Sequence, residues 1–258
     1  AGGSGTVTVI GTGSLAATGA LNGGIMVTET NSSITSSGGD VSVTGIEGAG
    51  PISLGIINQS SATITTAANG GNLTLIANSV ILTSAVSTNA GSSTTLRPYT
   101  NGVQINLGAD SDVIGGPLSL SDSELDFITT GTLLIGGANS GTITVSADIT
   151  RPAATNMQLV SNGDVTFSGG GINTGGGTLL LNPGTSPAAV KPAFNGMDAT
   201  ASTVSFGSDL SVVINGDTPG NGTGSTYTQL TVAGAVNLTG VDLVLSGAHA
   251  PVAGQTFT

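Results

Sequence analysis

At least seven copies of one short unit occur in this sequence: a glycine followed, two and four residues later, by apolar residues. Apolar residues at every second position are typical of a β-strand with one buried face. A unit that recurs along a chain predicts a repeat fold, in which each copy buries its apolar face by stacking on the next. The sequence therefore predicts an all-β solenoid with a structural function. The units begin at Gly5, Gly39, Gly71, Gly131, Gly141, Gly163 and Gly177.

The spacing of the units predicts irregular coils. The glycines that begin successive units lie 34, 32, 60, 10, 22 and 14 residues apart. This spacing fits coils of two or three strands with loops of variable length. Pro183, Pro187 and Pro192 mark a loop or boundary, because proline cannot donate to a β-ladder. We expect solenoid coils over residues 1–185, and over residues 186–258 a strand-rich segment that continues or caps them.

The composition restricts both the core and the partners. Aromatic residues make up 3% of the 258 residues and charged residues 7%, so the core must consist of Val, Ile, Leu and Ala. The net charge of -11, with only three Lys and Arg residues, disfavours nucleic acid and anionic lipid as partners. No stretch of about 18 apolar residues exists, so we expect no membrane insertion by a helix.

One helical turn is predicted at residues 121–128. Ser121 and Glu124 have the spacing of a capping box, in which each side chain accepts from the other residue's backbone. Leu125 and Ile128, three residues apart, would face the core. This turn also explains one of the two acidic clusters, formed by Asp122, Glu124 and Asp126.

Candidate chemical groups are few. The other acidic cluster, Asp110 with Asp112, offers oxygen ligands of the kind that Ca²⁺ prefers, but it lacks the glycine-rich pattern of calcium-binding β-rolls. His249 is the only histidine and lies in a predicted turn, with no sequence motif that couples it to a serine. We therefore assign no catalytic, cofactor-binding or metal-binding residue; calcium at the Asp110 cluster remains the one cofactor hypothesis.

Two further patterns permit a functional and a structural interpretation. Arg97, Arg151 and Lys191 each precede a proline, which favours extended loop or edge positions. They would be either solvated turn residues or exposed anchors that pair with acids of a neighbouring coil. Thr-x-Thr pairs at Thr6, Thr63 and Thr142 would suit a flat ice-binding array, although threonine is also a common outward residue of strands.

Three stretches resemble a known class of protein. Residues 94–108 and residues 120–145 resemble repeats of filamentous-haemagglutinin-like and autotransporter-type surface proteins of Gram-negative bacteria. Residues 227–240, with residues 253–257, resemble the β-strand repeats near the end of such passenger regions. The resemblance implies a right-handed parallel β-helix, secretion and a cell-surface or extracellular location, and it implies no catalytic residues.

These patterns lead to three functional hypotheses. The first is a structural or adhesive extracellular solenoid, not an enzyme, whose copies join end to end by strand addition; both ends of the sequence resemble cut strands, which favours this hypothesis. The second is an adhesin passenger that binds a surface glycan or a cell-surface partner. The third is a polysaccharide-degrading β-helix enzyme, which requires acids that converge in one groove.

Overall fold

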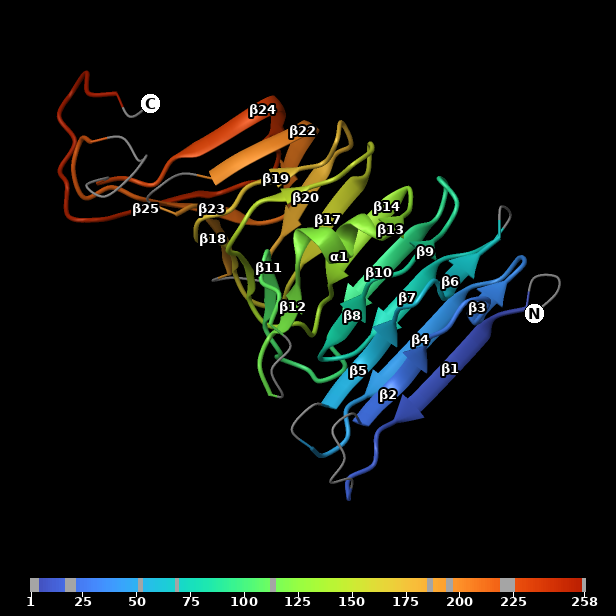
Figure 1. The fold of residues 1–258 in the computed structure, drawn as a ribbon. Helices are drawn as coiled ribbons and strands as arrows, with labels where there is room; N and C mark the ends of the chain where they lie inside the picture. The colour runs from blue at the N-terminus through green and yellow to red at the C-terminus, as the bar shows by residue number, and fades with distance from the viewer. Residues whose placement is uncertain are drawn as a thin grey trace.

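The chain folds into a parallel β-solenoid. The computed structural model describes residues 5–16, 22–50, 53–67, 70–111, 115–184, 188–193, 197–218 and 226–256. Within them, parallel strands stack coil upon coil along one axis, with a single short helix, α1 (Asp122–Asp126), near the middle (Figure 1). This arrangement confirms the predicted all-β solenoid with irregular coils.

Each coil supplies strands to three sides, which we number by their order in the coil. Side 1 is one continuous ladder of β1 (Val7–Thr12), β4 (Val41–Ile46), β7 (Leu73–Ile76), β10 (Ser93–Arg97), β14 (Thr132–Gly136), β17 (Asn156–Val160), β20 (Leu179–Asn182), β22 (Met197–Phe206) and β24 (Leu230–Asn237). The long strands β22 and β24 also turn the corner from side 3, since the first half of β22 pairs with a side-3 strand.

Sides 2 and 3 are each divided into two stacks. Side 2 consists of β2 (Asn22–Val27), β5 (Ser53–Asn58) and β8 (Val80–Leu82), and then of β12 (Leu118–Leu120), β11 (Ile105–Leu107), β15 (Ile143–Val145), β18 (Val165–Phe167), β21 (Ala189–Lys191), β23 (Asp209–Val213) and β25 (Leu243–Ser246). Side 3 consists of β3 (Ser33–Ser36), β6 (Thr63–Thr66), β9 (Val86–Ser87) and β13 (Ile128–Thr129), and then of β16 (Ile149–Thr150) and β19 (Ile172–Asn173), which leads to β22. We call residues 93–129, which run from β10 to β13, coil 4.

In-register pairing places equivalent side chains above one another in the core. On side 1 the column that runs through Leu75, Leu96, Ile135, Leu159 and Leu181 is fully buried. Alternate residues of the same strands point outward and are half-exposed. The core is therefore a set of aliphatic columns, as the low aromatic content predicts.

The seven glycine units all precede strands, which confirms the pattern. Five precede side-1 strands (β1, β4, β7, β14 and β20), and two precede the side-2 strands β15 and β18. Side-1 strands β10, β17 and β22 lack the glycine, so the glycine spacing differs from the coil length. Gly131 shows why the residue recurs: a Cβ there would lie 1.9 Å from the carbonyl oxygen of Ala90 in the coil before.

The insertion in coil 4 accounts for the largest irregularity. Between equivalent side-1 positions the chain takes 21 residues from Leu73 to Thr94 but 39 from Thr94 to Leu133. The extra residues form β12, which pairs with β11 of the same coil, and then α1. This additional side-2 strand was not among the predicted strands, although Gly116 followed by Leu118 and Leu120 has the spacing of the glycine unit.

The Thr-x-Thr pairs do not share a face. Thr8 lies on β1 of side 1, Thr65 on β6 of side 3, and Thr144 on β15 of side 2. The hypothesis of a single threonine array is therefore wrong, because the three pairs belong to different walls of the solenoid.

Thr94 is a polar residue in a core column and gives a direct test of the packing. It is fully buried between Leu73 and Leu133, and its hydroxyl has no hydrogen-bond partner in the described structure. We expect Thr94→Val to raise the free energy of unfolding by about 1 kcal/mol, because it removes a buried unsatisfied hydroxyl at nearly constant volume. Urea unfolding measures this change. The outward neighbour Thr95→Val is the control and should change stability by less than about 0.5 kcal/mol; a loss of stability in Thr94→Val would contradict this account of the column.

Candidate functional site

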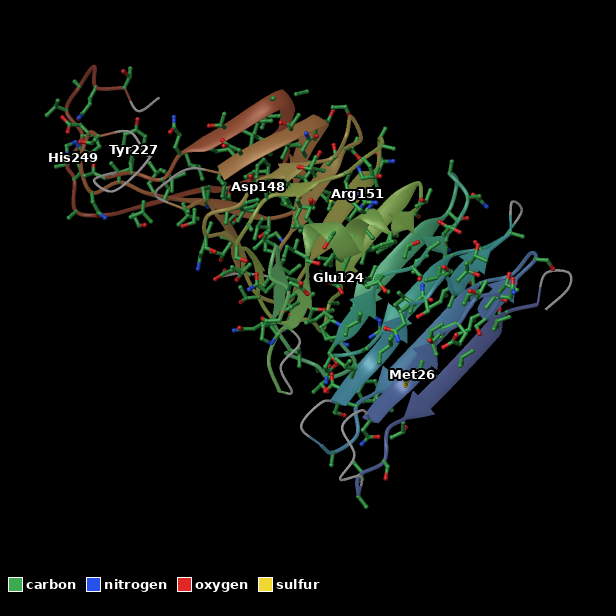
Figure 2. The ribbon with its side chains drawn as sticks, viewed as in Figure 1. Met26, Glu124, Asp148, Arg151, Tyr227 and His249 are labelled. Carbon is green, nitrogen blue, oxygen red and sulfur yellow. The ribbon has the colours of Figure 1, made fainter. Side chains whose placement is uncertain are left out.

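The ladders of sides 2 and 3 both stop at coil 4, and the buried charged residues of the described structure lie there. No strand pairing joins β8 to β12 or β13 to β16 among the described residues. Glu124 is 7% exposed and Arg151 is 3% exposed, whereas every other described Asp, Glu, Lys or Arg residue is more accessible. Figure 2 shows both side chains near α1, in the middle of the molecule. This interruption is the strongest candidate site.

Glu124 satisfies the backbone at the side-2 interruption. Its Oε1 accepts the N–H of Leu82, the last residue of β8, at 3.2 Å. Its Oε2 accepts the backbone N–H of Ser121 at 3.0 Å and the Ser121 hydroxyl at 2.9 Å, and the Ser121 hydroxyl in turn accepts the Glu124 N–H. The predicted capping box is therefore confirmed, with Leu125 and Ile128 buried as expected. The same carboxylate also replaces the missing strand partner of β8.

Burial dominates the electrostatics of Glu124. Loss of solvent raises the pKa of this carboxyl above its ordinary value, and the hydrogen bonds from Ser121 and Leu82 oppose that rise. Burial also raises the pKa of Asp126, helped by the nearby charge of Asp122. The site thus contains acids that hold their protons more tightly than exposed carboxyls do.

Arg151 and Asp122 bridge the side-3 interruption. The Arg151 guanidinium donates to the carbonyl oxygens of Leu125 in α1 and Ile128 in β13. Asp122 accepts the backbone N–H of Thr150 in β16 at 2.6 Å. Asp126 lies 3.7 Å from Arg151 and remains partly exposed. The two edges that lack a strand partner are therefore joined by charged side chains.

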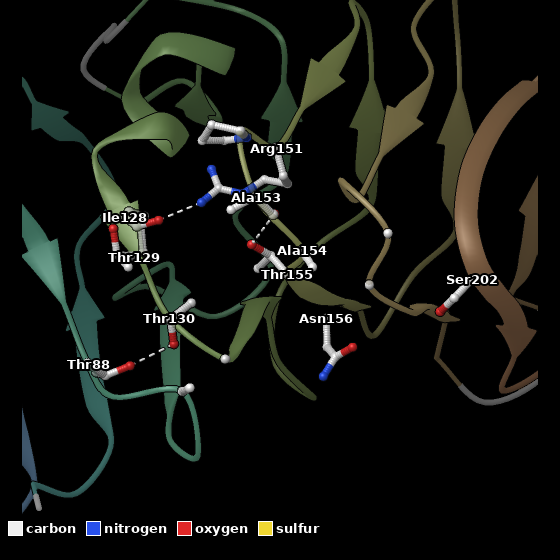
Figure 3. Close-up of a pocket in the computed structure, with 15 residues that line it drawn as sticks. Thr88, Ile128, Thr129, Thr130, Arg151, Ala153, Ala154, Thr155, Asn156 and Ser202 are labelled. Carbon is white, nitrogen blue, oxygen red and sulfur yellow. Dashed lines mark hydrogen bonds between the residues drawn. The ribbon is translucent and has the colours of Figure 1, made fainter. Parts of the chain in front are cut away.

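A cavity of about 470 Å³ opens beside this interruption, at the corner between sides 3 and 1 (Figure 3). Its apolar lining includes Ala90, Ile128 and Pro152, and Arg151 forms part of its wall. Several of its hydroxyls are already engaged: Thr88 and Thr130 bond to each other at 2.7 Å, and Thr155 donates to the carbonyl oxygen of Ala153. No carboxylate or imidazole lines it. Its lining therefore has no general acid–base pair, and its polar groups are hydroxyls, amides and the Arg151 guanidinium.

A second, smaller cavity of about 170 Å³ lies on side 3 and includes two acids, Asp148 and Asp198, in its lining. Asp148 already accepts the backbone N–H of Gly171 at 2.8 Å. The described residues contain no group of three or more His, Cys, Asp or Glu residues that could hold a metal ion.

Many Asp and Asn side chains serve the ladder itself. Eight of them accept a backbone N–H from the next coil, at 2.6 to 3.0 Å. Each bond extends the backbone ladder by one rung at a strand end, in the manner of an N-cap. Four of the acids that are scattered in the sequence thus share a structural role with four asparagines. The eight acceptors are Asp40, Asn72, Asn78, Asp122, Asp148, Asn156, Asp164 and Asn215.

The acids singled out in the sequence do not converge on one cavity. Asp122, Glu124 and Asp126 bond to β16, to β8 and to Arg151, respectively. Asp110 lies in an exposed loop, and Asp112, its partner in the calcium hypothesis, lies outside the described residues. His249 contacts Gln255 through its Nε2, at 3.1 Å.

The three cations have different environments. Lys191 ends β21 and pairs with Asp164 of the preceding coil at 2.5 Å, as the anchor interpretation predicts. Arg97 ends β10 and is half-buried. The expectation of an exposed position is wrong for Arg151, because the interrupted ladder leaves carbonyl groups in the interior that its guanidinium satisfies. The sequence signal that could have identified it is the long interval before it, since the 39 residues from Thr94 to Leu133 are the longest separation between equivalent side-1 positions of the described strands.

Protonation of Glu124 gives a pH-dependent test. Because the folded-state pKa is raised, the contribution of Glu124 to stability is greatest below its ordinary value of 4.5 and is lost as the pH rises through the raised value. We expect the free energy of unfolding of the wild type, minus that of Glu124→Gln, to decrease as the pH rises from about 4 to about 7. Asp126 is present in both proteins, so its contribution to the free energy of unfolding cancels in this difference. Urea unfolding across this range measures the difference, and a flat or rising difference for Glu124→Gln would contradict the assignment.

The bonds between coils give a second test, at Asp164. Its Oδ1 accepts the N–H of Ala189 at 3.0 Å, while Oδ2 pairs with the exposed Lys191. We expect Asp164→Asn, which keeps an acceptor for Ala189, to be more stable than Asp164→Ala by about 1 kcal/mol. Equal stability of the two variants in thermal or urea unfolding would show that the exposed ion pair, and not the bond to Ala189, is the contribution that matters.

No protein-family model, no curated protein and no solved structure matches the chain. In the part of the chain that the structure describes, no helix has the length and apolar character required to cross a membrane.

Proposed function

We propose that this chain is a structural solenoid of the cell surface or extracellular space, and not an enzyme. The observation that carries the proposal is the continuous side-1 ladder, from β1 to β24, over buried aliphatic columns. Such a ladder resists bending and stretching because neighbouring strands share backbone hydrogen bonds along the axis. The larger cavity has no acid–base pair, and acids elsewhere bond to neighbouring coils, which agrees with a structural function.

The extracellular location rests on the resemblance of residues 94–108, 120–145, 227–240 and 253–257 to repeats of filamentous-haemagglutinin-like and autotransporter-type surface proteins. The mixture of Ser, Thr and Asn on outward positions, with few charges, agrees with that class. Secretion and display on a cell surface are part of the proposal for this reason.

The terminal coils support end-to-end assembly with a second copy. In the last coil Leu243 and Leu245 pair with the inward-facing Leu210 and Val212, yet both are 59% exposed. On side 1, the columns begin in the first coil with Val7 and Val9, which are only half-buried, and reach Val236 of β24, which is 45% exposed. Among the described strands, β1 and β24 on side 1 and β2 and β25 on side 2 each have one neighbour in their sheet. The first coil of another copy supplies parallel strands and aliphatic columns of the matching kind, and repetition of this contact gives a filament.

A second candidate function, binding of a neutral surface glycan, is favoured by the cavity of about 470 Å³. Thr88, Thr129, Thr130, Thr155, Asn156 and Ser202 contribute its polar lining, and Arg151 is its one charged residue. A panel of immobilised neutral and anionic glycans tests this function; binding that is unchanged by Ala154→Trp, which fills the cavity, would place the glycan elsewhere.

End-to-end assembly is tested by the inward and outward residues of β25. We expect filaments by negative-stain microscopy and an average mass that rises with concentration in light scattering. Leu245→Lys should abolish both, because it places a charge in the column that the next copy must cover. Val244→Lys is the matched control, since Val244 pairs with the outward-facing Ser211 and should not affect assembly. A wild-type protein that remains monomeric at every concentration would refute the assembly.

A further inference from the structure

At coil 4 the strand pairing of side 1 is unbroken, whereas the strand pairing of sides 2 and 3 is interrupted. On side 1, β10 pairs with both β7 and β14, so the ladder passes through coil 4 without a gap. On side 2 the stack that ends at β8 is not paired with β12, and on side 3 the stack that ends at β13 is not paired with β16, among the described strands. The two interruptions lie one coil apart, because β13 still pairs with β9 and β11 still pairs with β15. Among the described strands, side 1 is therefore the one ladder that connects the coils before coil 4 with those after it.

The links that replace the missing ladders are side-chain bonds. Glu124 reaches Leu82 across the side-2 interruption, and Asp122 reaches Thr150 across the side-3 interruption. Arg151 reaches the carbonyl oxygens of Leu125 and Ile128. In a strand ladder, each hydrogen bond is held in place by the bonds of the neighbouring residues. These side-chain bonds are separate from one another, so each can open while the strand pairing on the same side stays intact.

The position of the cavity provides room for movement. The cavity of about 470 Å³ lies between the ends of β13 and β16, next to Arg151. Packed interiors resist small displacements because every side chain has neighbours on all sides. On side 3, the residues that line the cavity lack neighbours on one side. Bending that widens or narrows sides 2 and 3 requires no change in the pairing of β7, β10 and β14.

We propose that coil 4 is a hinge about which the two halves of the solenoid bend, with side 1 as the axis and Asp122, Glu124 and Arg151 as the latch that holds one angle. The hinge arises from the inserted strand β12 and helix α1, because they occupy the level at which the strand stacks of sides 2 and 3 would otherwise continue. A long rod with such a hinge bends at one level and remains stiff on either side of it.

Hydrogen exchange tests the latch. In Arg151→Met, which keeps an apolar side chain of similar length, we expect the amides of α1, β13 and β16 to exchange at least about tenfold faster than in the wild type, a change that corresponds to about 1.4 kcal/mol. The amides of β7, β10 and β14 should be unchanged. Lys191→Met removes the exposed ion pair with Asp164 and is the matched control. Unchanged exchange, or faster exchange along the whole solenoid, would overturn the proposal. Asp122→Ala, which removes only the acceptor for Thr150, repeats the test if Arg151→Met does not fold.

Spin-label distances test the axis of the bend. The chain has no cysteine, so introduced pairs can be labelled specifically. A pair on side 3 at Thr63 and Thr200 should show a distance distribution that broadens in Asp122→Ala, because these positions flank the interruption. A pair on side 1 at Thr74 and Ser205 should keep a narrow distribution, because both belong to the continuous ladder. Equal widths for both pairs in both proteins would overturn the hinge.

Discussion

The stacking of side 1 is the constraint on which the rest of the structure depends. Its strands pair in register from β1 to β24, so each core position lies above its equivalent in the previous coil. Columns such as Leu75, Leu96 and Ile135 bury aliphatic surface only because this register is kept. Sides 2 and 3 can be lengthened, interrupted or bent at corners, since the continuous ladder still fixes the position of every coil along the axis.

Where the backbone ladder ends, polar and charged side chains form the hydrogen bonds that a neighbouring strand would otherwise supply. At strand ends an Asp or Asn side chain accepts the N–H of the next coil, as Asp148 does for Gly171. At coil 4 the same need arises in the interior, and Glu124 and Arg151 meet it there at the cost of burying charge. A buried backbone group without a partner costs more than one that a charged side chain satisfies, which explains both residues without a catalytic role.

Much of the fold could be predicted because it depends on local pattern. The glycine units predicted seven strands, and the spacing of Ser121 and Glu124 predicted the helical turn, since both signals involve residues only a few positions apart. The strands β10 and β17 do not contain the glycine unit, because a serine or threonine replaces the glycine before them. The candidate site was not predicted, because Arg151 precedes a proline as exposed turn residues do, and its burial depends on a gap between strands more than twenty residues apart.

The sequence by itself determined that this chain forms short strands with one aliphatic face, a capped helical turn and a surface with little charge. These properties follow from residue type and from spacings of two to four positions. Only the tertiary structure decided that β12 pairs back onto β11, and hence that sides 2 and 3 stop at coil 4 while side 1 continues. The reason is that pairing between coils joins residues one coil apart, and the coil length itself varies with each loop. Which N–H and C=O groups lack a strand partner, and which acids and arginines must satisfy them, is therefore fixed only once the coils are stacked.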